Sequence, residues 1–323
     1  MQRREGIPLQ FLKLSYWPVW IALGFLRLIA ILPHGLRQPL GRALGRLLLK
    51  QNSKRVEIVK LNLEWAFPEL SAQKREKLAQ EFYAYSGQML IDYGFCWWSS
   101  ATRFKQAVKI EGLEPIKALM AQGERVILVT GHALALDVGG VAISQQLPLV
   151  TYANKMRNPL IQWMMERGRC RFDVELLQRE SGMRPLIRAL KNGRLLYYVI
   201  DEDMPEHSVF ASYFGVAKAT LTAPARVAKM TGAKVAPCFT FFDRQRGVYV
   251  VRIGQVMEGF PSGEDVVDAQ AVNEKLERDI RCAPSQYMWT QRLYKTRPDG
   301  TPPPYRMVGN SGSGPRSRPE TDH

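Results

Sequence analysis

The chain has 323 residues, of which 46% are hydrophobic, so it can bury a large core in one or two domains. Its formal net charge of +15 favours an anionic partner: a phospholipid surface, a phosphorylated glycolipid, nucleic acid or an acidic protein. The four cysteines form no C-x-x-C pair and only four histidines are present, which argues against a disulfide framework or a histidine-rich metal cluster and favours a reduced, cytoplasmic setting.

The first predicted element is an apolar helix near the N-terminus. Between Leu14 and Leu32 only Arg27 is charged, and aromatic residues gather near the beginning of the stretch. This length is close to the about 20 apolar residues that cross a bilayer, and no small-residue cleavage site follows it. We expect a membrane anchor. Arg27 and Pro18 interrupt the apolar run, so a helix that lies in the interface stays open beside a spanning one, as does a buried core helix.

A basic helical stretch comes next, at residues 36–60, where seven Lys or Arg side chains alternate with leucines. These cations either face solvent or contact anionic lipid headgroups. Phe67-Pro68 breaks the pattern, and Ser71 then caps a further helix that runs towards Trp98.

From residue 125 onward, apolar runs alternate with helical stretches. The apolar runs predict strands at Val126–Thr130, Pro148–Tyr152, Leu195–Ile200, Val235–Phe241 and Val248–Ile253. Helices are expected near Asn158–Arg167, Met183–Lys191 and Thr222–Met230. This alternation indicates an α/β sheet with helices packed on its faces. The end of the chain, from Gly309, is polar and rich in Gly, Ser and Pro, which predicts a disordered tail.

One histidine stands out because it follows a buried strand directly. His132 comes after Gly131, and Asp137 follows five positions later with only small and apolar residues between. Within one helix the two side chains would point about 140° apart. If His132 lies in the turn after the strand and a helix begins next, Asp137 can reach the imidazole. A carboxylate on Nδ1 would leave Nε2 free as a base. The chain offers no nucleophile beside them, so the substrate would bring its own hydroxyl; a histidine that only caps the helix is the alternative.

The stretch Gly131–Asp137 resembles the H-x4-D/E motif of glycerolipid and lipid A acyltransferases. Further motifs, in the same order, resemble the late, secondary acyltransferases of lipid A biosynthesis, the lauroyl/myristoyl type, and are closest to the myristoyltransferase branch. They lie at Arg55–Leu63 with Phe67-Pro-Glu, Asn158-Pro-Leu, Arg167–Arg171, Asp201–Asp203, Pro205–Gly215 with Lys218-Ala-Thr-Leu, and Pro284–Pro298. The chain departs from the pattern at Glu202, where glutamine is usual, and at Ser285, where glutamate is usual.

The resemblance implies a mixed sheet flanked by helices, as in glycerolipid acyltransferases. We expect a membrane anchor at residues 1–35, an acyltransferase domain at 36–306 and a disordered tail at 307–323. The implied reaction moves a lauroyl or myristoyl chain from acyl carrier protein to the 3-hydroxyl of an acyl chain on a lipid A precursor. His132 would remove the proton and Asp137 would hold the imidazole. No metal or cofactor is implied.

Five further residues are predicted to contact substrate. Arg169 and Arg171 belong to a basic cluster that suits phosphates or carboxylates, although it also fits an ordinary surface. Asp201 and Asp203 follow a strand, at the edge of an α/β sheet where ligands gather, and would bond sugar hydroxyls or orient an arginine; as turn carboxylates they would bond backbone donors instead. His207 would assist near the acceptor, or form a structural bond in its loop.

The expected partners are acyl carrier protein, a lipid A precursor and an anionic membrane. The expected location is the inner membrane, with the active site facing the cytoplasm. Two other functions stay open at this stage: acyl transfer to glycerol phosphates or mannosylated lipids, and non-catalytic binding of anionic lipid or nucleic acid. Nucleic acid is disfavoured, because the cations lie beside an apolar anchor and no recognition motif is present.

Overall fold

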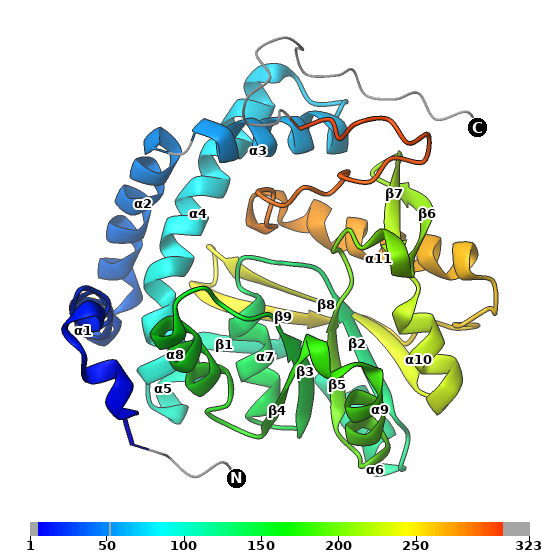
Figure 1. Ribbon diagram of the computed structural model, residues 1–323, viewed down its shortest axis with the longest axis horizontal. Helices are drawn as coiled ribbons and strands as arrows, with labels where there is room; N and C mark the ends of the chain where they lie inside the picture. Colours follow the sequence, from blue (N-terminus) through cyan, green and yellow to red (C-terminus); the bar gives the residue numbers. More distant parts are fainter. Residues whose placement is uncertain (1–5, 52, 306–323) are drawn as a thin grey trace.

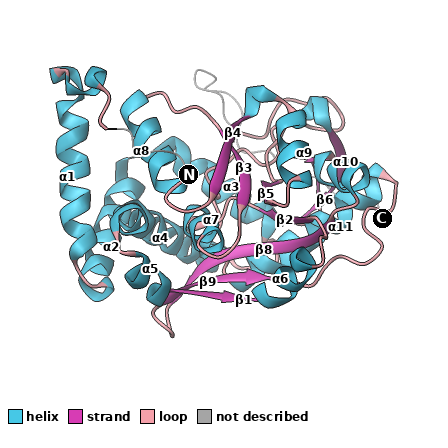
Figure 2. Ribbon diagram, turned by 90° about the horizontal axis from the view of Figure 1, so that it is seen from below, coloured by secondary structure: helices cyan, strands magenta, loops and turns pink. Residues whose placement is uncertain are grey.

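The computed structural model describes residues 6–51 and 53–305. A mixed seven-stranded sheet, in the order β1-β9-β8-β2-β5-β3-β4, lies at the centre of these residues, and helices cover both of its faces (Figures 1 and 2). The prediction of a mixed sheet flanked by helices is confirmed. The predicted tail at 307–323 lies outside the described residues.

The strands of the central sheet overlap all five of the strands predicted from apolar runs. They are β1 (Val108–Glu111), β2 (Val126–Thr130), β3 (Leu149–Ala153), β4 (Val174–Gln178), β5 (Leu195–Val199), β8 (Lys234–Asp243) and β9 (Val248–Ile253). A separate two-stranded sheet pairs β6 (Ser208–Tyr213) with β7 (Val216–Leu221). The missed β1 and β4 are the two edge strands of the central sheet, and half-buried positions are common in both, so neither has an apolar run.

Strand β2 is central to the position of the site. All five of its residues are buried, and it lies parallel to both β8 and β5. In the β2–β5 pair Thr130 lies opposite Val199, so the two strands end level with each other. The loops that follow them therefore begin at the same edge of the sheet.

Helices connect the strands and cover the sheet. Figure 2 shows α4 and α7 on one side of the sheet and α9, α10 and α11 on the other. The bounds are α5 (Ala101–Ala107), α6 (Leu113–Ala121), α7 (Leu136–Ser144), α8 (Pro159–Arg169), α9 (Met183–Lys191), α10 (Ala223–Thr231) and α11 (Asp265–Cys282). The three helices predicted in this part of the chain are confirmed as α8, α9 and α10.

The helices before α5 are α1 (Trp17–Ile31), α2 (His34–Gln51), α3 (Ser53–Ala66) and α4 (Ala72–Trp98). The prediction of a cap at Ser71 is confirmed, because its Oγ accepts a hydrogen bond from the backbone of Lys74 at 3.3 Å. The basic stretch expected to be helical at 36–60 is helical at all of its described residues, which belong to α2 and α3.

A buried ion pair joins these helices to the sheet. Arg37 of α2 lies 2.6 Å from Asp92 of α4, and both side chains are almost fully buried. Gln88 of α4 and Tyr249 of β9 also donate hydrogen bonds to Asp92, at 2.8 and 2.5 Å. Arg37 therefore neither faces solvent nor contacts headgroups, unlike the expectation for the basic stretch. Breaking such a pair leaves a buried charge without compensation.

The N-terminal helix is exposed over most of its length. Residues Leu14–Ile31 are long and apolar enough to cross a membrane, judged by length and composition alone, and 11% of them are buried. The helix α1 packs on α4, whose Gly94 lies against Leu26. The boundaries proposed at 35/36 and 306/307 stay predictions.

We predict that Gly87→Ala destabilises the protein because α2 and α4 touch at this glycine. An added Cβ would lie 2.2 Å from the carbonyl oxygen of Gly41 and 2.3 Å from the backbone nitrogen of Gly45, and backbone atoms cannot rotate away. Overpacking of this kind costs about 1–3 kcal/mol. The free energy of unfolding in urea, measured in detergent, tests the prediction. Gly24→Ala is the matched control, since nothing lies within 4 Å of the added Cβ, and it should not destabilise. Equal stability of both variants would contradict the close contact.

Candidate active site

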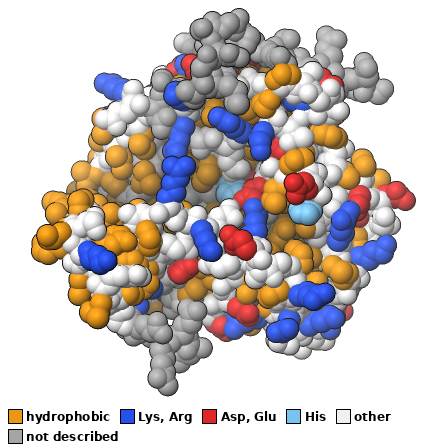
Figure 3. Space-filling view, viewed as in Figure 1, with side chains coloured by type: hydrophobic (Ala, Val, Ile, Leu, Met, Phe, Trp, Pro, Cys, Tyr) orange, Lys and Arg blue, Asp and Glu red, His pale blue; other side chains and the backbone are white. Residues whose placement is uncertain are grey.

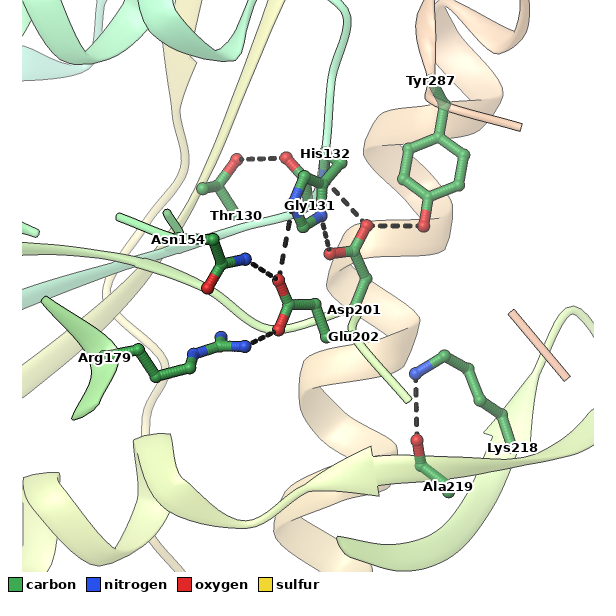
Figure 4. Close-up of polar contacts among 10 residues, drawn as sticks. All are labelled: Thr130, Gly131, His132, Asn154, Arg179, Asp201, Glu202, Lys218, Ala219 and Tyr287. Atoms are coloured by element: carbon green, nitrogen blue, oxygen red, sulfur yellow. Dashed lines mark hydrogen bonds and ion pairs between the residues drawn. The ribbon is translucent and has the colours of Figure 1, made fainter. Parts of the chain in front are cut away.

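The site is centred on His132, two residues beyond the end of β2. Asp201 lies two residues beyond the end of β5, and the register of the two strands places it beside the histidine. Asp201 accepts two hydrogen bonds from His132: Nδ1 lies 2.6 Å from Oδ1, and the backbone nitrogen lies 2.8 Å from Oδ2 (Figure 4). The carboxylate therefore holds both the backbone and the ring of the histidine, and leaves Nε2 as the free nitrogen.

Asp137 does not hold the imidazole, so this part of the predicted dyad is corrected. As expected, a helix, α7, begins just after His132 and places Asp137 in its first turn. From there the carboxylate faces α8 and accepts two hydrogen bonds from Arg169, at 2.9 Å from Nε and 3.2 Å from Nη2. This geometry is a bidentate ion pair.

A C-terminal segment fixes the histidine loop from the other side. Tyr287 donates its hydroxyl to Asp201 at 2.6 Å, and the backbone of Met288 donates to the carbonyl of His132 at 2.8 Å. The segment is held in turn by Asn62 of α3, whose amide donates to the carbonyl oxygens of Trp289 and Gln291, at 2.7 Å each. Three regions distant in sequence thus position one side chain.

Gly131 allows the close approach between the histidine loop and its carboxylate. A Cβ at this position would lie 2.8 Å from the Leu276 side chain and 3.1 Å from Oδ2 of Asp201. Any larger residue would push Asp201 or α11 away. The glycine is therefore needed here for space.

Acidic groups on both sides of the imidazole control its charge. Burial disfavours the imidazolium, but the carboxylates of Asp201 and Glu202 outweigh burial and raise the pKa of His132. Glu202 lies 3.8 Å from Nε2 and is bound by Arg179 and by the amide of Asn154. Conversely, the His132 ring and its hydrogen bonds keep the pKa of the buried Asp201 below its ordinary value, although burial opposes this.

A cavity of about 260 Å³ opens beside this group. Its polar lining includes His132, Asp137, Arg169 and Glu202, and aliphatic and aromatic side chains complete the wall. A histidine base with a free Nε2 can remove a proton from a hydroxyl placed in this cavity, and the apolar wall suits a hydrocarbon chain.

Of the two arginines predicted to bind substrate, the cavity is lined by Arg169 and not by Arg171. Arg171 donates from Nη1 and Nη2 to the carbonyl oxygens of Cys96 and Ser99. It thereby caps the C-terminal end of α4, which is a favourable position for a cation. The structure gives Arg171 a structural role at this helix end, in place of the predicted substrate contact.

The two predicted aspartates accept backbone hydrogen bonds, which is the alternative left open for them, and neither they nor His207 line the cavity. Asp201 orients the histidine. Asp203 accepts from the backbone and hydroxyl of Thr296, at 2.7 and 2.6 Å, and so holds the C-terminal segment. His207 lies in a 3-10 turn (Pro205–His207), is exposed and does not line the cavity.

Two residues near the site were missed as functional candidates. Tyr287 belongs to the Pro284–Pro298 motif, and its position in that motif was the one available signal. Lys218 is fully buried beside the loop that carries Asp201, and its Nζ donates to the carbonyl of Ala219 at 3.1 Å (Figure 4). Burial lowers the pKa of this lysine, while the field of Asp201, Asp203 and Glu202 opposes the change. Lys218 begins the Lys218-Ala-Thr-Leu motif, and this position was the one available signal for it.

We predict that Glu202→Gln lowers the pKa of His132. The substitution removes a negative charge 3.8 Å from Nε2, which disfavours the imidazolium. An NMR titration of the imidazole signals tests this, with His34 and His207 as internal references. Glu206→Gln is the control, because Glu206 is an exposed carboxylate in the same loop and should leave the His132 titration unchanged. An unaltered His132 pKa in Glu202→Gln would show that this carboxylate does not act on the ring.

Comparison with known proteins identifies the family. The family model of bacterial lipid A biosynthesis acyltransferases matches residues 6–296. The chain is 32% identical to a lipid A biosynthesis acyltransferase of Haemophilus influenzae, over 90% of this chain and 91% of that protein. It is 34% identical to the lipid A biosynthesis lauroyltransferase of Escherichia coli, with 90% and 95% covered, and 30% identical to the myristoyltransferase of the same organism, with 90% and 91% covered. With this match along nearly its whole length, and with a hydrogen-bonded His132–Asp201 pair beside a largely apolar cavity, the chain is an acyltransferase of the bacterial lipid A biosynthesis family.

Proposed function

We propose that the protein transfers a fatty acyl chain from acyl carrier protein to a hydroxyl of an acyl chain on a lipid A precursor. The observation that carries this proposal is His132, whose Nδ1 is held by Asp201 while the ring lines the apolar cavity. Among the described residues, no serine or cysteine lines the cavity, so the arrangement supplies a base for a hydroxyl that the substrate brings. The relatives named above act in lipid A biosynthesis, which supports the choice of acceptor.

In the proposed reaction, Nε2 of His132 takes the proton of the acceptor hydroxyl as the oxygen attacks the thioester carbonyl. Asp201 stabilises the imidazolium that forms. The tetrahedral intermediate then collapses: the new ester forms, the C–S bond breaks, and the departing sulfur of the carrier receives the proton from His132. The histidine ends the cycle neutral, and no oxidant or reductant is involved.

Asp137 and Arg169 are proposed to provide fixed positive charge near the reacting carbonyl. Arg169 lines the cavity, and its ion pair with Asp137 holds the guanidinium in one geometry. A charge held in place before the reaction stabilises a developing oxyanion without reorganisation. The same guanidinium suits a phosphate of the acceptor, which keeps the predicted substrate-binding role of Arg169.

The proposed acyl chain is lauroyl or myristoyl, and the proposed acceptor group is the 3-hydroxyl of an existing acyl chain. Relatives of both types match this chain, at 34% and 30% identity, which supports this range of chain lengths without choosing within it. The proposed location is the inner membrane, with the site facing the cytoplasm, and the exposed apolar helix α1 supports attachment to a membrane.

We expect His132→Ala to lower acyl transfer by at least about 10²-fold, the usual contribution of a positioned general base. The assay measures transfer of acyl groups from acyl carrier protein to a purified lipid A precursor, followed by mass spectrometry. His207→Ala is the matched control, because this histidine is exposed and does not line the cavity, and it should retain wild-type transfer. Full transfer by folded His132→Ala would remove the histidine from the mechanism. Transfer by wild type to glycerol phosphate alone would reassign the acceptor.

Asp201→Asn and Asp137→Asn are expected to differ in their pH dependence. Loss of the Asp201 carboxylate lowers the pKa of His132, so the acidic limb of the kcat/KM profile should move to lower pH while the plateau falls by at least about 10²-fold. Asp137→Asn should lower the plateau and leave the limb in place, since Asp137 pairs with Arg169. Measurement of kcat/KM between acidic and neutral pH gives the plateau and the acidic limb of each variant and so tests both expectations. A shifted limb in Asp137→Asn alone would restore the dyad expected from the sequence.

A further inference from the structure

Most of the exposed surface of α1 is apolar, and Arg27 is its one exposed charged side chain. Its exposed side chains recur every three to four residues, so they form one face of the helix; they are Trp17, Ile21, Phe25, Leu28 and Ile31, each between 55% and 68% exposed. The short 3-10 turns before it add Leu9, Leu12 and Leu14, which are also exposed. Figure 3 shows these hydrophobic side chains gathered at the left of the molecule, over α1.

The next helix continues this surface. Leu36, Leu40 and Leu47 of α2 are exposed at spacings of four and seven, on the face opposite the glycines that touch α4. Figure 1 shows α1 end-on and α2 lengthwise at the same outer edge, and Figure 2 shows α1 lengthwise. The two helices therefore cross within one outer layer of the molecule, and both have an apolar outer side.

Both ends of α1 are held against the folded domain. At its C-terminal end, the guanidinium of Arg103 donates to the carbonyl oxygens of Ala30, Ile31 and Leu32, at 2.7–3.0 Å. These are the acceptors that a helix end leaves unpaired, and a cation is favourable there. Arg103 precedes β1 by only a few residues, so the end of α1 is fixed to the sheet domain.

At the other end, an aromatic cluster attaches α1 to α8. Phe11 and Trp20 lie 5.8 and 6.4 Å, between ring centroids, from Trp163 of α8. The indole of Trp20 also donates to the carbonyl of Phe11 at 2.8 Å. Leu23 packs in the same cluster with Leu160 and Met164 of α8.

The charged side chains of the segment that contains α1 and α2 are all basic. From Gly6 to Val56 the chain has eight Lys or Arg residues and no Asp or Glu. Of these cations Arg46 and Lys50 are exposed on α2, the helix that carries the leucine stripe. An apolar face beside exposed cations fits a bilayer that contains anionic lipids.

We propose that α1 and the leucine stripe of α2 form one membrane-docking face, and that the protein lies on a single leaflet with α1 in the plane of the interface. If α1 crossed the bilayer, α4, which packs along it, and α8, which contacts its N-terminal half at Trp20 and Leu23, would enter the hydrocarbon with it. Yet α8 carries Gln162, Glu166 and Arg167, and charged groups are costly there. With 15 residues, α1 is about 22 Å long, against about 30 Å of hydrocarbon.

This arrangement rests on the membrane attachment proposed above and adds a route for the acceptor. Leu160 and Met164, on α8, pack against the buried inner side of α1 at Leu23, and Arg169, at the end of the same helix, lines the cavity beside His132. The helix α8 thus fixes the distance between a lipid in the leaflet and the site. If α1 were instead a spanning anchor joined flexibly to the domain, the distance between the membrane and the site would vary.

The first test measures binding of the full chain to vesicles by flotation. Leu40→Glu/Leu47→Glu should lower binding to phosphatidylethanolamine/phosphatidylglycerol vesicles by at least about tenfold, because two leucines no longer enter the apolar layer. Val266→Glu/Val267→Glu on α11 is the control: both valines are exposed, at 54% and 55%, yet lie far from the docking face, so binding should not change. Wild-type binding by the α2 variant would overturn the proposal. Transfer to a detergent-dispersed acceptor should persist in both variants, which separates this result from a failure of the proposed function.

The second test locates the two ends of α1. Gly6→Cys and Gly35→Cys flank the helix, and nothing lies within 4 Å of a Cβ added at either position. In a Cys282→Ser background, which removes the exposed native cysteine, a membrane-impermeant maleimide is applied to inside-out and right-side-out vesicles. We expect both new cysteines to react from the cytoplasmic side only, with the parent variant as control. Labelling of the two cysteines from opposite sides of the membrane would overturn the proposal and show that α1 spans.

Discussion

The parallel alignment of β2 with β5 is the constraint on which the rest of the site depends. The two strands end level, with Thr130 opposite Val199, and each chain continues for two residues to His132 or Asp201. A shift of one residue in this register would move the two side chains apart and turn one of them towards the other face of the sheet. The ladder of backbone hydrogen bonds thus sets the 2.6 Å contact between imidazole and carboxylate.

Segments far apart in the sequence complete what the strands begin. Tyr287 bonds the second oxygen of Asp201, and Asn62 of α3 holds the segment that carries Tyr287. Because Asp201 and Tyr287 are buried, each lost hydrogen bond would leave a polar group unpaired away from water. The motifs at Arg55–Leu63 and Pro284–Pro298 therefore both help to keep the loop that carries His132 in place. The outer helices α1 and α2 pack on α4 and carry the proposed membrane-docking face.

Much of this architecture follows from local patterns. Buried strands such as β2 and β5 are apolar runs, the cap at Ser71 follows from its side chain, and the exposed apolar side of α1 follows from composition. The edge strand β4 was missed because all five of its residues are half-buried and they form no continuous apolar run.

For the site, the sequence by itself determined that His132 would follow a buried strand and that a helix carrying Asp137 would begin just after it. It also placed Asp201 at the end of another strand. Only the tertiary structure decided which carboxylate meets the imidazole, because five positions of separation along the chain say nothing about direction in space. Asp137, in the first turn of α7, is drawn to the guanidinium of Arg169, whereas Asp201 reaches the ring across the β2–β5 ladder. Strand order and register are contacts between distant segments, and no local pattern contains them.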